Sequence, residues 1–126
     1  MTKPMRIVLI ESPFATTDLH SKEENIAFAT LARNHSIAIM GEAPIVPHLM
    51  WATGSWPDRD TCLKLRNAMR RTVDATVVYC RMDDKKEHGM DLTPGILSGV
   101  LDAKRIHQHV EYRIVDRYGV VAEDQL

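Results

Sequence analysis

Polar residues that could take part in catalysis or binding follow directly after a short apolar run near the start of the chain. Residues 7–10 are aliphatic, and Glu11, Ser12, Pro13 and Phe14 come next. Such a run is typical of a strand buried on both faces, and Pro13 cannot continue it because proline has no N–H to donate. Open α/β sheets bind ligands at the carboxyl ends of their strands. We therefore expect these four residues to form part of a ligand pocket; the alternative is an ordinary exit from a strand into a loop.

Two further carboxylates, Asp83 and Asp84, follow another apolar run at residues 75–80. Together with Glu11 they are candidate catalytic residues, because carboxylates serve as general acids, bases and nucleophiles. The alternative is that residues 81–91 form a solvated loop of mixed charge.

An anion site is expected around residues 93–98. Thr93 and Pro94 are typical of a helix start, with a capping hydroxyl before a proline at the first helical position. Unpaired N–H groups and the helix dipole favour an anion at this end. Thr93 and Gly95 are therefore candidate ligand contacts, and Ser98 is a further candidate in the same helix.

Aromatic residues follow the second apolar run. His48, Trp51 and Trp56 come after residues 43–47, and a flat indole can stack on a nucleobase. With the expected anion site, they indicate a nucleoside or nucleotide ligand, and Glu11 would bond a sugar hydroxyl or a base edge. The alternatives are that the indoles cover the end of the sheet and that His48 is a hydrogen-bonded structural histidine.

No metal and no cofactor are expected. His107 and His109 are close in sequence, but no cysteine or carboxylate accompanies them at a spacing typical of metal sites. The sequence also contains neither a P-loop nor the glycine-rich dinucleotide motif.

The elements that must position these residues alternate in type. Four apolar runs predict strands, and three segments with capping and helical spacing lie between them. The first helix begins with a capping box at Ser21 and Glu24 and stops at Gly41, the second follows Asp58 or Asp60, and the third follows Thr93. The apolar stripe of the second helix is expected to include Leu65, Ala68, Met69 and Val73, and the predicted strands are residues 5–10, 43–47, 75–80 and 110–115.

This alternation predicts a single α/β domain spanning residues 1–126. The sheet should be doubly wound and mainly parallel, with four to five strands and helices on both faces. The length of 126 residues and the 44% hydrophobic content are sufficient for one substantial core.

The net charge and the cysteines indicate which partners and which cellular compartment to expect. The net charge of -1 argues against binding to a nucleic-acid polymer or a membrane surface. The sequence shows neither a membrane span nor a signal peptide. Cys62 and Cys80 lie in apolar-patterned segments, which favours buried thiols over a disulfide. We expect a cytoplasmic protein.

Five segments in order resemble one family. They are IESPFA, GEAPIVPHLMW, DATVVYC, TPGILSGVLDAK and VEYR. The chain carrying them resembles the nucleoside 2-deoxyribosyltransferase-like superfamily, and more closely a small branch common in bacteria and phages. The resemblance covers most of the chain, and it implies a Rossmann-like or flavodoxin-like fold that is usually oligomeric.

The resemblance also implies a ligand and a reaction. Members bind a nucleoside or nucleoside monophosphate and cleave or transfer at the N-glycosidic bond, using a glutamate nucleophile near the start of the last helix. The loop after the first strand and the amino terminus of the last helix hold the sugar and any phosphate.

The chain departs from this pattern at the nucleophile. The matching position, four residues after Gly95, is Gly99, and the adjacent Ser98 cannot replace a carboxylate. One hypothesis is a binding module that senses or sequesters a nucleoside phosphate or an ADP-ribose-like ligand. The alternative is an N-glycoside hydrolase or deoxyribosyltransferase with a relocated carboxylate at Glu11, Asp83 or Asp84. A purely structural role would leave the polar strand ends unexplained.

Overall fold

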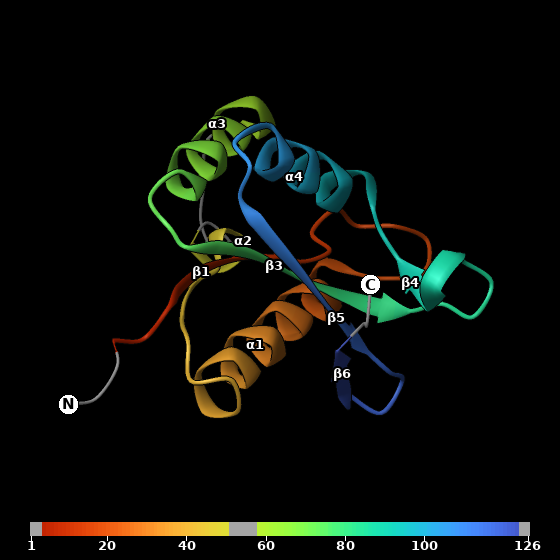
Figure 1. Cartoon of the computed structure of the whole chain (residues 1–126). Coiled ribbons are helices and arrows are strands. Elements are labelled where there is room, and N and C mark those ends of the chain that lie inside the picture. Colours follow the sequence, from red (N-terminus) through yellow and green to blue (C-terminus); the bar gives the residue numbers. More distant parts are fainter. Residues whose placement is uncertain (1–3, 51–57, 124–126) are drawn as a thin grey trace.

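The computed structural model describes residues 4–50 and 58–123, which form a mixed α/β fold around one sheet (Figure 1). The elements in chain order are β1 (Ile7–Glu11), α1 (Lys22–Ala38), β2 (Ala43–Ile45), α2 (Pro47–Met50), α3 (Arg59–Arg70), β3 (Ala75–Met82), a 3₁₀ turn (Glu87–Gly89), β4 (Met90–Asp91), α4 (Pro94–Arg105), β5 (His109–Val115) and β6 (Val121–Glu123).

The sheet is mostly parallel. Its strand order is β2-β1-β3-β5-β6, in which β2, β1, β3 and β5 run parallel and β6 pairs antiparallel with β5. The short β4 pairs antiparallel with the end of β3. The four predicted strands are confirmed, and β4 and β6 bring the sheet to six strands. These two strands have two and three residues, which is too short for an alternating pattern to reveal.

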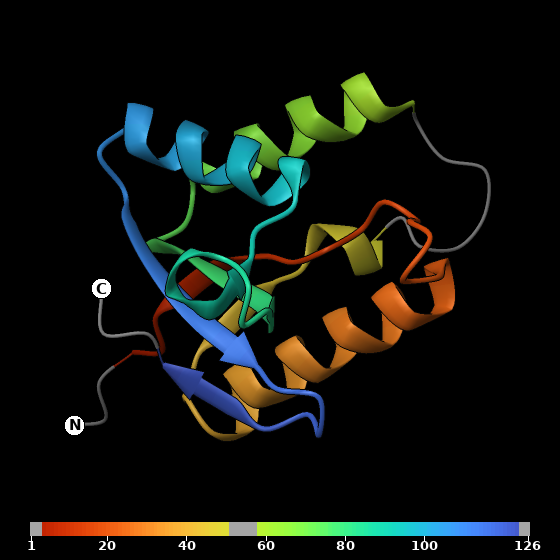
Figure 2. The same ribbon diagram turned by 90° about the vertical axis from the view of Figure 1, so that its right-hand side faces the viewer.

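Helices cover both faces of the sheet. In Figure 2, α3 and α4 lie above the sheet and α1 lies below it. On the α1 side, Val8 and Ile10 of β1 pack in one apolar cluster with Phe28 and Ala32. On the other side, a second cluster joins β3 to α4 through residues including Val78 and Ile96. Successive residues of a strand point to opposite faces, so β3 contributes Val77 to the first cluster and Val78 to the second.

Three helices begin at capping residues that the sequence predicts. Ser21 and Glu24 form the predicted capping box at the start of α1. Asp58 caps α3, and Thr93 caps α4 with proline at the first helical position. The α1 helix ends at Ala38, before the predicted stop, and Gly41 adopts a φ of +64° in the turn toward β2.

The expected apolar stripe of α3 is wrong. Leu65 and Ala68 are exposed, whereas Arg66 and Arg70 are the residues that this helix buries. The reason lies beneath the helix, where buried carboxylates require cationic partners rather than aliphatic side chains. The helix therefore packs a face that carries two arginines against the body of the protein.

The state of the cysteines and the character of the helices can be compared with the sequence-based expectations. Cys80 is buried and Cys62 is half-buried, and neither forms a disulfide. In the described part of the chain, no helix has the length and apolar character required to cross a bilayer.

Candidate functional site

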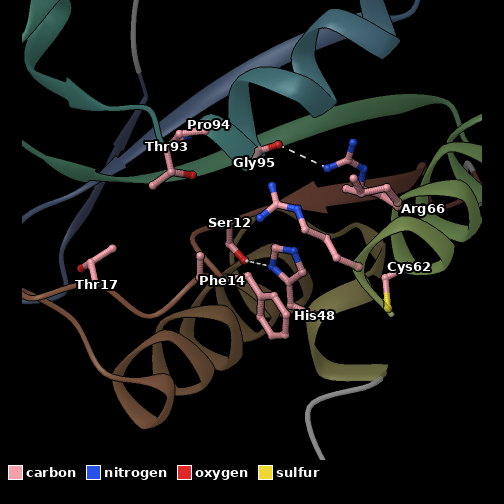
Figure 3. A pocket seen from close by; sticks show the side chains of 12 residues that line it. Ser12, Phe14, Thr17, His48, Cys62, Arg66, Thr93, Pro94 and Gly95 are labelled. Carbon is pink, nitrogen blue, oxygen red and sulfur yellow. Dashed lines mark hydrogen bonds between the residues drawn. The ribbon is translucent and has the colours of Figure 1, made fainter. Parts of the chain in front are cut away.

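A cavity of about 480 Å³ opens at the carboxyl end of β1 (Figure 3). The loop after β1, α2, α3 and the start of α4 all contribute to its wall. This volume is in the range of small-molecule pockets. The described lining residues are Ser12, Phe14, Ala15, Thr17, His48, Arg59, Cys62, Leu63, Arg66, Thr93, Pro94 and Gly95.

Five of the candidate ligand contacts line this cavity together. They come from three separate segments of the chain and are Ser12, Phe14, His48, Thr93 and Gly95. The expectation that the loop after β1 and the start of α4 face the same space is therefore met by the structure.

The three remaining candidate ligand contacts are not among the described lining residues of the cavity. Pro13 is buried beside the cavity without lining it, and Ser98 is exposed but not part of the described lining. Trp51 lies outside the described residues, as does Trp56.

An aromatic pair forms one wall. The rings of Phe14 and His48 stack with their centroids 4.5 Å apart and their planes at 17°. His48 is held there because α2 begins at Pro47, directly after β2, and its Nδ1 lies 3.2 Å from the Ser12 hydroxyl. Burial, with a smaller contribution from the charge of Arg66, lowers the pKa of His48 to about 4. The ring is therefore neutral at physiological pH.

A buried arginine borders the cavity. The Nη1 of Arg66 donates to the Gly95 carbonyl at 3.2 Å and to Oε2 of Glu11 at 3.4 Å. Its Nη2 donates to the Ser98 hydroxyl at 3.3 Å, and its Nε donates to Asn67 at 3.2 Å. A guanidinium has five N–H donors, so one donor on Nη2 has no partner among the described residues. Burial lowers the pKa of Arg66, but an arginine stays charged in the physiological range.

Glu11 does not contact the cavity, so its expected place in the pocket floor is wrong. Only 1% of the residue is exposed, and it is not among the described lining residues. Its position in β1 places its side chain on the face that α3 and α4 cover, where Oε1 accepts a hydrogen bond from Nη2 of Arg70 at 3.2 Å. Burial raises the pKa of Glu11, while the charges of Arg66 and Arg70 oppose this rise.

Asp83 and Asp84 lie away from this cavity. Asp84 is exposed, and Asp83 lines a second cavity of about 610 Å³ between α1, the end of β3 and the β5–β6 turn. These residues are separated from the first cavity because β3 continues to Met82 and pairs with β4. The pairing directs the loop between the two strands away from that cavity. The structure therefore does not bring Asp83 and Asp84 together with the other candidate site residues at the first cavity.

The start of α4 supplies anion-binding groups. The hydroxyl oxygen of Thr93 accepts a hydrogen bond from the Ile96 N–H at 3.3 Å, which leaves the hydroxyl proton to donate. Gly95 belongs to the first turn, whose N–H groups have no acceptor within the helix. This arrangement favours a negative charge in front of the helix.

Arg66 and Arg70 were missed at the sequence level. A signal for them exists, since Glu11 ends a strand buried on both faces and a buried carboxylate needs a cationic partner. Two arginines four positions apart share one face of a helix. That pairing would have selected residues 66 and 70 in place of the apolar stripe.

The cavity combines cationic side chains with flat aromatic rings. Its described lining contains Arg59 and Arg66 and no carboxylate. The Ser12–His48 contact has the form of a nucleophile–base pair, but a histidine with a pKa near 4 is a weak base. No group of three or more potential metal ligands occurs within residues 4–50 and 58–123.

The sequence was compared with protein-family models and with curated proteins, and neither comparison gives a match.

Proposed function

We propose that the protein binds a nucleoside phosphate or an ADP-ribose-like ligand in the cavity at the end of β1, and that it senses or sequesters this ligand. One observation carries the proposal. Cationic and N–H donor groups meet a neutral aromatic pair in the same cavity, with Thr93 and Gly95 on one side and Phe14 and His48 on the other (Figure 3).

The phosphate end is assigned to Arg66 and the start of α4. Arg66 lies within hydrogen-bond distance of the Gly95 carbonyl, so its guanidinium and the first turn of the helix are adjacent. Charge-assisted hydrogen bonds from a guanidinium are among the strongest that a phosphate receives in proteins. Arg59 adds a second positive charge to the lining.

The base end is assigned to the aromatic pair. Phe14 and His48 present flat surfaces, and Leu63 and Pro94 add apolar area to the lining. The neutral His48 ring has one nitrogen near Ser12, and its second ring nitrogen offers one hydrogen bond to a base edge.

The topology supports this location. We infer a doubly wound, Rossmann-like arrangement, since α1 covers one face and α3 and α4 cover the other around the strand order β2-β1-β3-β5. In such sheets the ligand binds outside the carboxyl ends of strands where the winding reverses, which is between β1 and β3 here. The resemblance to the nucleoside 2-deoxyribosyltransferase-like superfamily agrees with the ligand class.

A second candidate function is cleavage at the N-glycosidic bond with Glu11 as a relocated carboxylate. One observation favours it: the Glu11 carboxylate fills the space that a side chain at position 99 would occupy. Arg66 lies between this carboxylate and the cavity, so the reaction would require Arg66 to move aside. We therefore place binding first.

Titration calorimetry tests the proposal, with AMP, adenosine and inorganic phosphate as separate probes. We expect AMP to bind at least about tenfold more tightly than adenosine, because only AMP engages the cationic end. Arg66→Met should remove this preference, and Arg117→Met, at the second cavity, should leave it unchanged. Equal binding of AMP and adenosine would contradict the proposal, and so would a failure of AMP to bind.

We also propose that the chain assembles with copies of itself, as the family resemblance implies. Leu97 and Leu101 of α4 and Leu65 of α3 are exposed, and exposed apolar side chains favour association when they are clustered. Sedimentation velocity at micromolar concentration tests this, and a single monomeric species would contradict it.

A further inference from the structure

Glu11 is a buried carboxylate that holds two arginines. Its side chain is 1% exposed, and its two oxygens accept from different guanidinium groups, Oε2 from Arg66 and Oε1 from Arg70. The first arginine borders the cavity and the second is fully buried. Glu11 thus joins a group facing the cavity to a group in the interior.

The interior arginine is fixed from several directions. Nε of Arg70 donates to Asp102 at 3.0 Å, and its Nη1 donates to the Thr76 hydroxyl at 2.6 Å. Asp102 is held in turn by two hydrogen bonds from Arg71, each 3.1 Å long. Arg70 is therefore anchored to both α4 and β3, and it provides a rigid support for Glu11.

Gly99 makes room for this arrangement. A Cβ at position 99 would lie 2.9 Å from Oε1 of Glu11 and closer still to the other atoms of the carboxylate. Such an approach is sterically forbidden, so any side chain at this position would displace the carboxylate from the arginines. The presence of glycine at position 99, on the buried face of α4, is thus explained by the space that the Glu11 carboxylate occupies.

We propose that Glu11 is a positioning residue, which orients Arg66 toward the cavity and fixes the direction of its remaining Nη2 donor. For the ligand, the inference rests on the proposed function. Without the carboxylate charge, Arg66 and Arg70 would be two neighbouring cations with no shared counter-ion. Arg66, which borders the cavity, is then the one that turns toward solvent.

Two roles for Glu11 predict effects of opposite sign on anion binding. If Glu11 only contributed a distant negative charge, Glu11→Gln would make the cavity more positive and strengthen the binding of AMP. If Glu11 positions Arg66, the same substitution weakens AMP binding by about tenfold, because a preorganised charged hydrogen bond is lost. The sign of the change therefore separates the two roles.

The first experiment needs no ligand. The Nε–H signal of Arg66 is recorded by nitrogen–proton NMR and assigned by its loss in Arg66→Lys. We expect its exchange with solvent to become at least about tenfold faster in Glu11→Gln, because loss of the ion pair at Nη1 lets the guanidinium turn and break the hydrogen bond of Nε to Asn67. Asp83→Asn, at the second cavity, serves as the control and should leave it unchanged. Unaltered exchange in a folded Glu11→Gln protein would overturn the inference.

The second experiment measures AMP affinity by calorimetry in the same variants. Glu11→Gln should bind about tenfold more weakly, and tighter or equal binding would overturn the inference. Gly99→Ala provides an independent variant, because it keeps the charge of Glu11 but displaces its carboxylate, and it should show the same loss. If the parent binds no AMP, the proposed function fails in that respect, while the NMR experiment still decides whether Glu11 holds Arg66.

Discussion

At the scale of single residues, the state of His48 has a measurable effect on stability. Its pKa is lowered to about 4 in the folded protein by burial, while in the unfolded chain it has the ordinary value of about 6.5. A group whose pKa is lower in the folded state contributes stability above its unfolded pKa, and this is lost as the pH falls toward the folded pKa.

We therefore expect the free energy of unfolding to decrease by about 2 kcal/mol between pH 7.5 and pH 5 on account of His48. Urea denaturation at the two pH values measures this, with His48→Asn as the matched variant because asparagine keeps a polar side chain that does not titrate. The parent should lose about 2 kcal/mol more than His48→Asn over this range. Equal losses would mean that His48 is protonated without penalty.

Glu42 is a second residue with a clear energetic role. It accepts hydrogen bonds from both terminal nitrogens of the fully buried Arg113, at 2.8 and 2.9 Å, and it also contacts Arg6 and Ser36. Of the side chains in the described residues, Arg113 has the one buried polar atom without a hydrogen-bond partner, its Nε. The positive charge of Arg113 is thus balanced by Glu42, which is buried, and by Glu111, whose Oε2 accepts from Nη2 at 3.0 Å.

We expect Glu42→Gln to lower the free energy of unfolding by about 3 kcal/mol, because it leaves the buried cation with only the partly exposed Glu111 as a charged partner within the described part of the chain. Glu23→Gln, on the exposed side of α1, is the control and should change it by less than about 0.5 kcal/mol. In the parent, the hydrogen bonds hold the pKa of Glu42 at about 2, so this stabilisation is complete above about pH 4.5 and declines as the pH falls toward 2. A neutral effect of Glu42→Gln in urea denaturation would contradict this interpretation.

At the scale of elements, the first turn of α4 has two functions that one substitution can separate. The Thr93 side chain caps the helix, and the same turn is the proposed phosphate site. Thr93→Asn and Thr93→Asp both retain a capping oxygen, since asparagine and aspartate are favourable residues at this position. They differ in charge.

We expect the two variants to have free energies of unfolding within about 1 kcal/mol of each other. Their affinities for AMP should differ by at least about tenfold, with Thr93→Asp the weaker because its carboxylate repels the phosphate. Thermal denaturation and calorimetry on the same samples make the comparison. Equal affinities would place the phosphate elsewhere.

Most elements were predictable because their signals are local. Runs of aliphatic residues define β1, β3 and β5, and side-chain caps at Ser21, Asp58 and Thr93 define where three helices begin. The orientation of α3 was not predictable from its own sequence. Its buried face is chosen by the carboxylates beneath it, so the apolar pattern pointed to the wrong side.

The candidate site was predictable in part for the same reason. Ser12, His48 and Thr93 gather because each directly follows a strand or starts a helix, and the topology fixes these ends. Asp83 was misplaced because the β3–β4 pairing, which redirects its loop, depends on two short segments meeting. Arg66 was missed because its role exists only through contacts with Glu11 and α4.

At the scale of the whole molecule, one assay distinguishes a protein that only binds its ligand from an enzyme that cleaves the N-glycosidic bond. A panel of ribonucleotides, deoxyribonucleotides and nicotinamide-containing dinucleotides is incubated with the protein, and released nucleobase is measured by chromatography. We expect no release, because the described lining of the cavity contains no carboxylate.

Base release by the parent would contradict this expectation, and three amide variants would then locate the catalyst. If Glu11→Gln abolishes turnover while Asp83→Asn and Asp84→Asn do not, Glu11 is the relocated carboxylate of the second candidate function. Turnover that survives all three substitutions would exclude these carboxylates as the catalyst.

The contact between Gly99 and Glu11 also restricts how this sequence can change over time. A side chain at position 99 would occupy the volume of the Glu11 carboxylate, so position 99 can gain one only if the side chain at position 11 is displaced. Substituting Glu11 first by a small residue removes the clash but leaves Arg66 and Arg70 without their shared carboxylate. Each single step is unfavourable, so we expect positions 11 and 99 to vary together among descendants of this chain, with a large residue at only one of them.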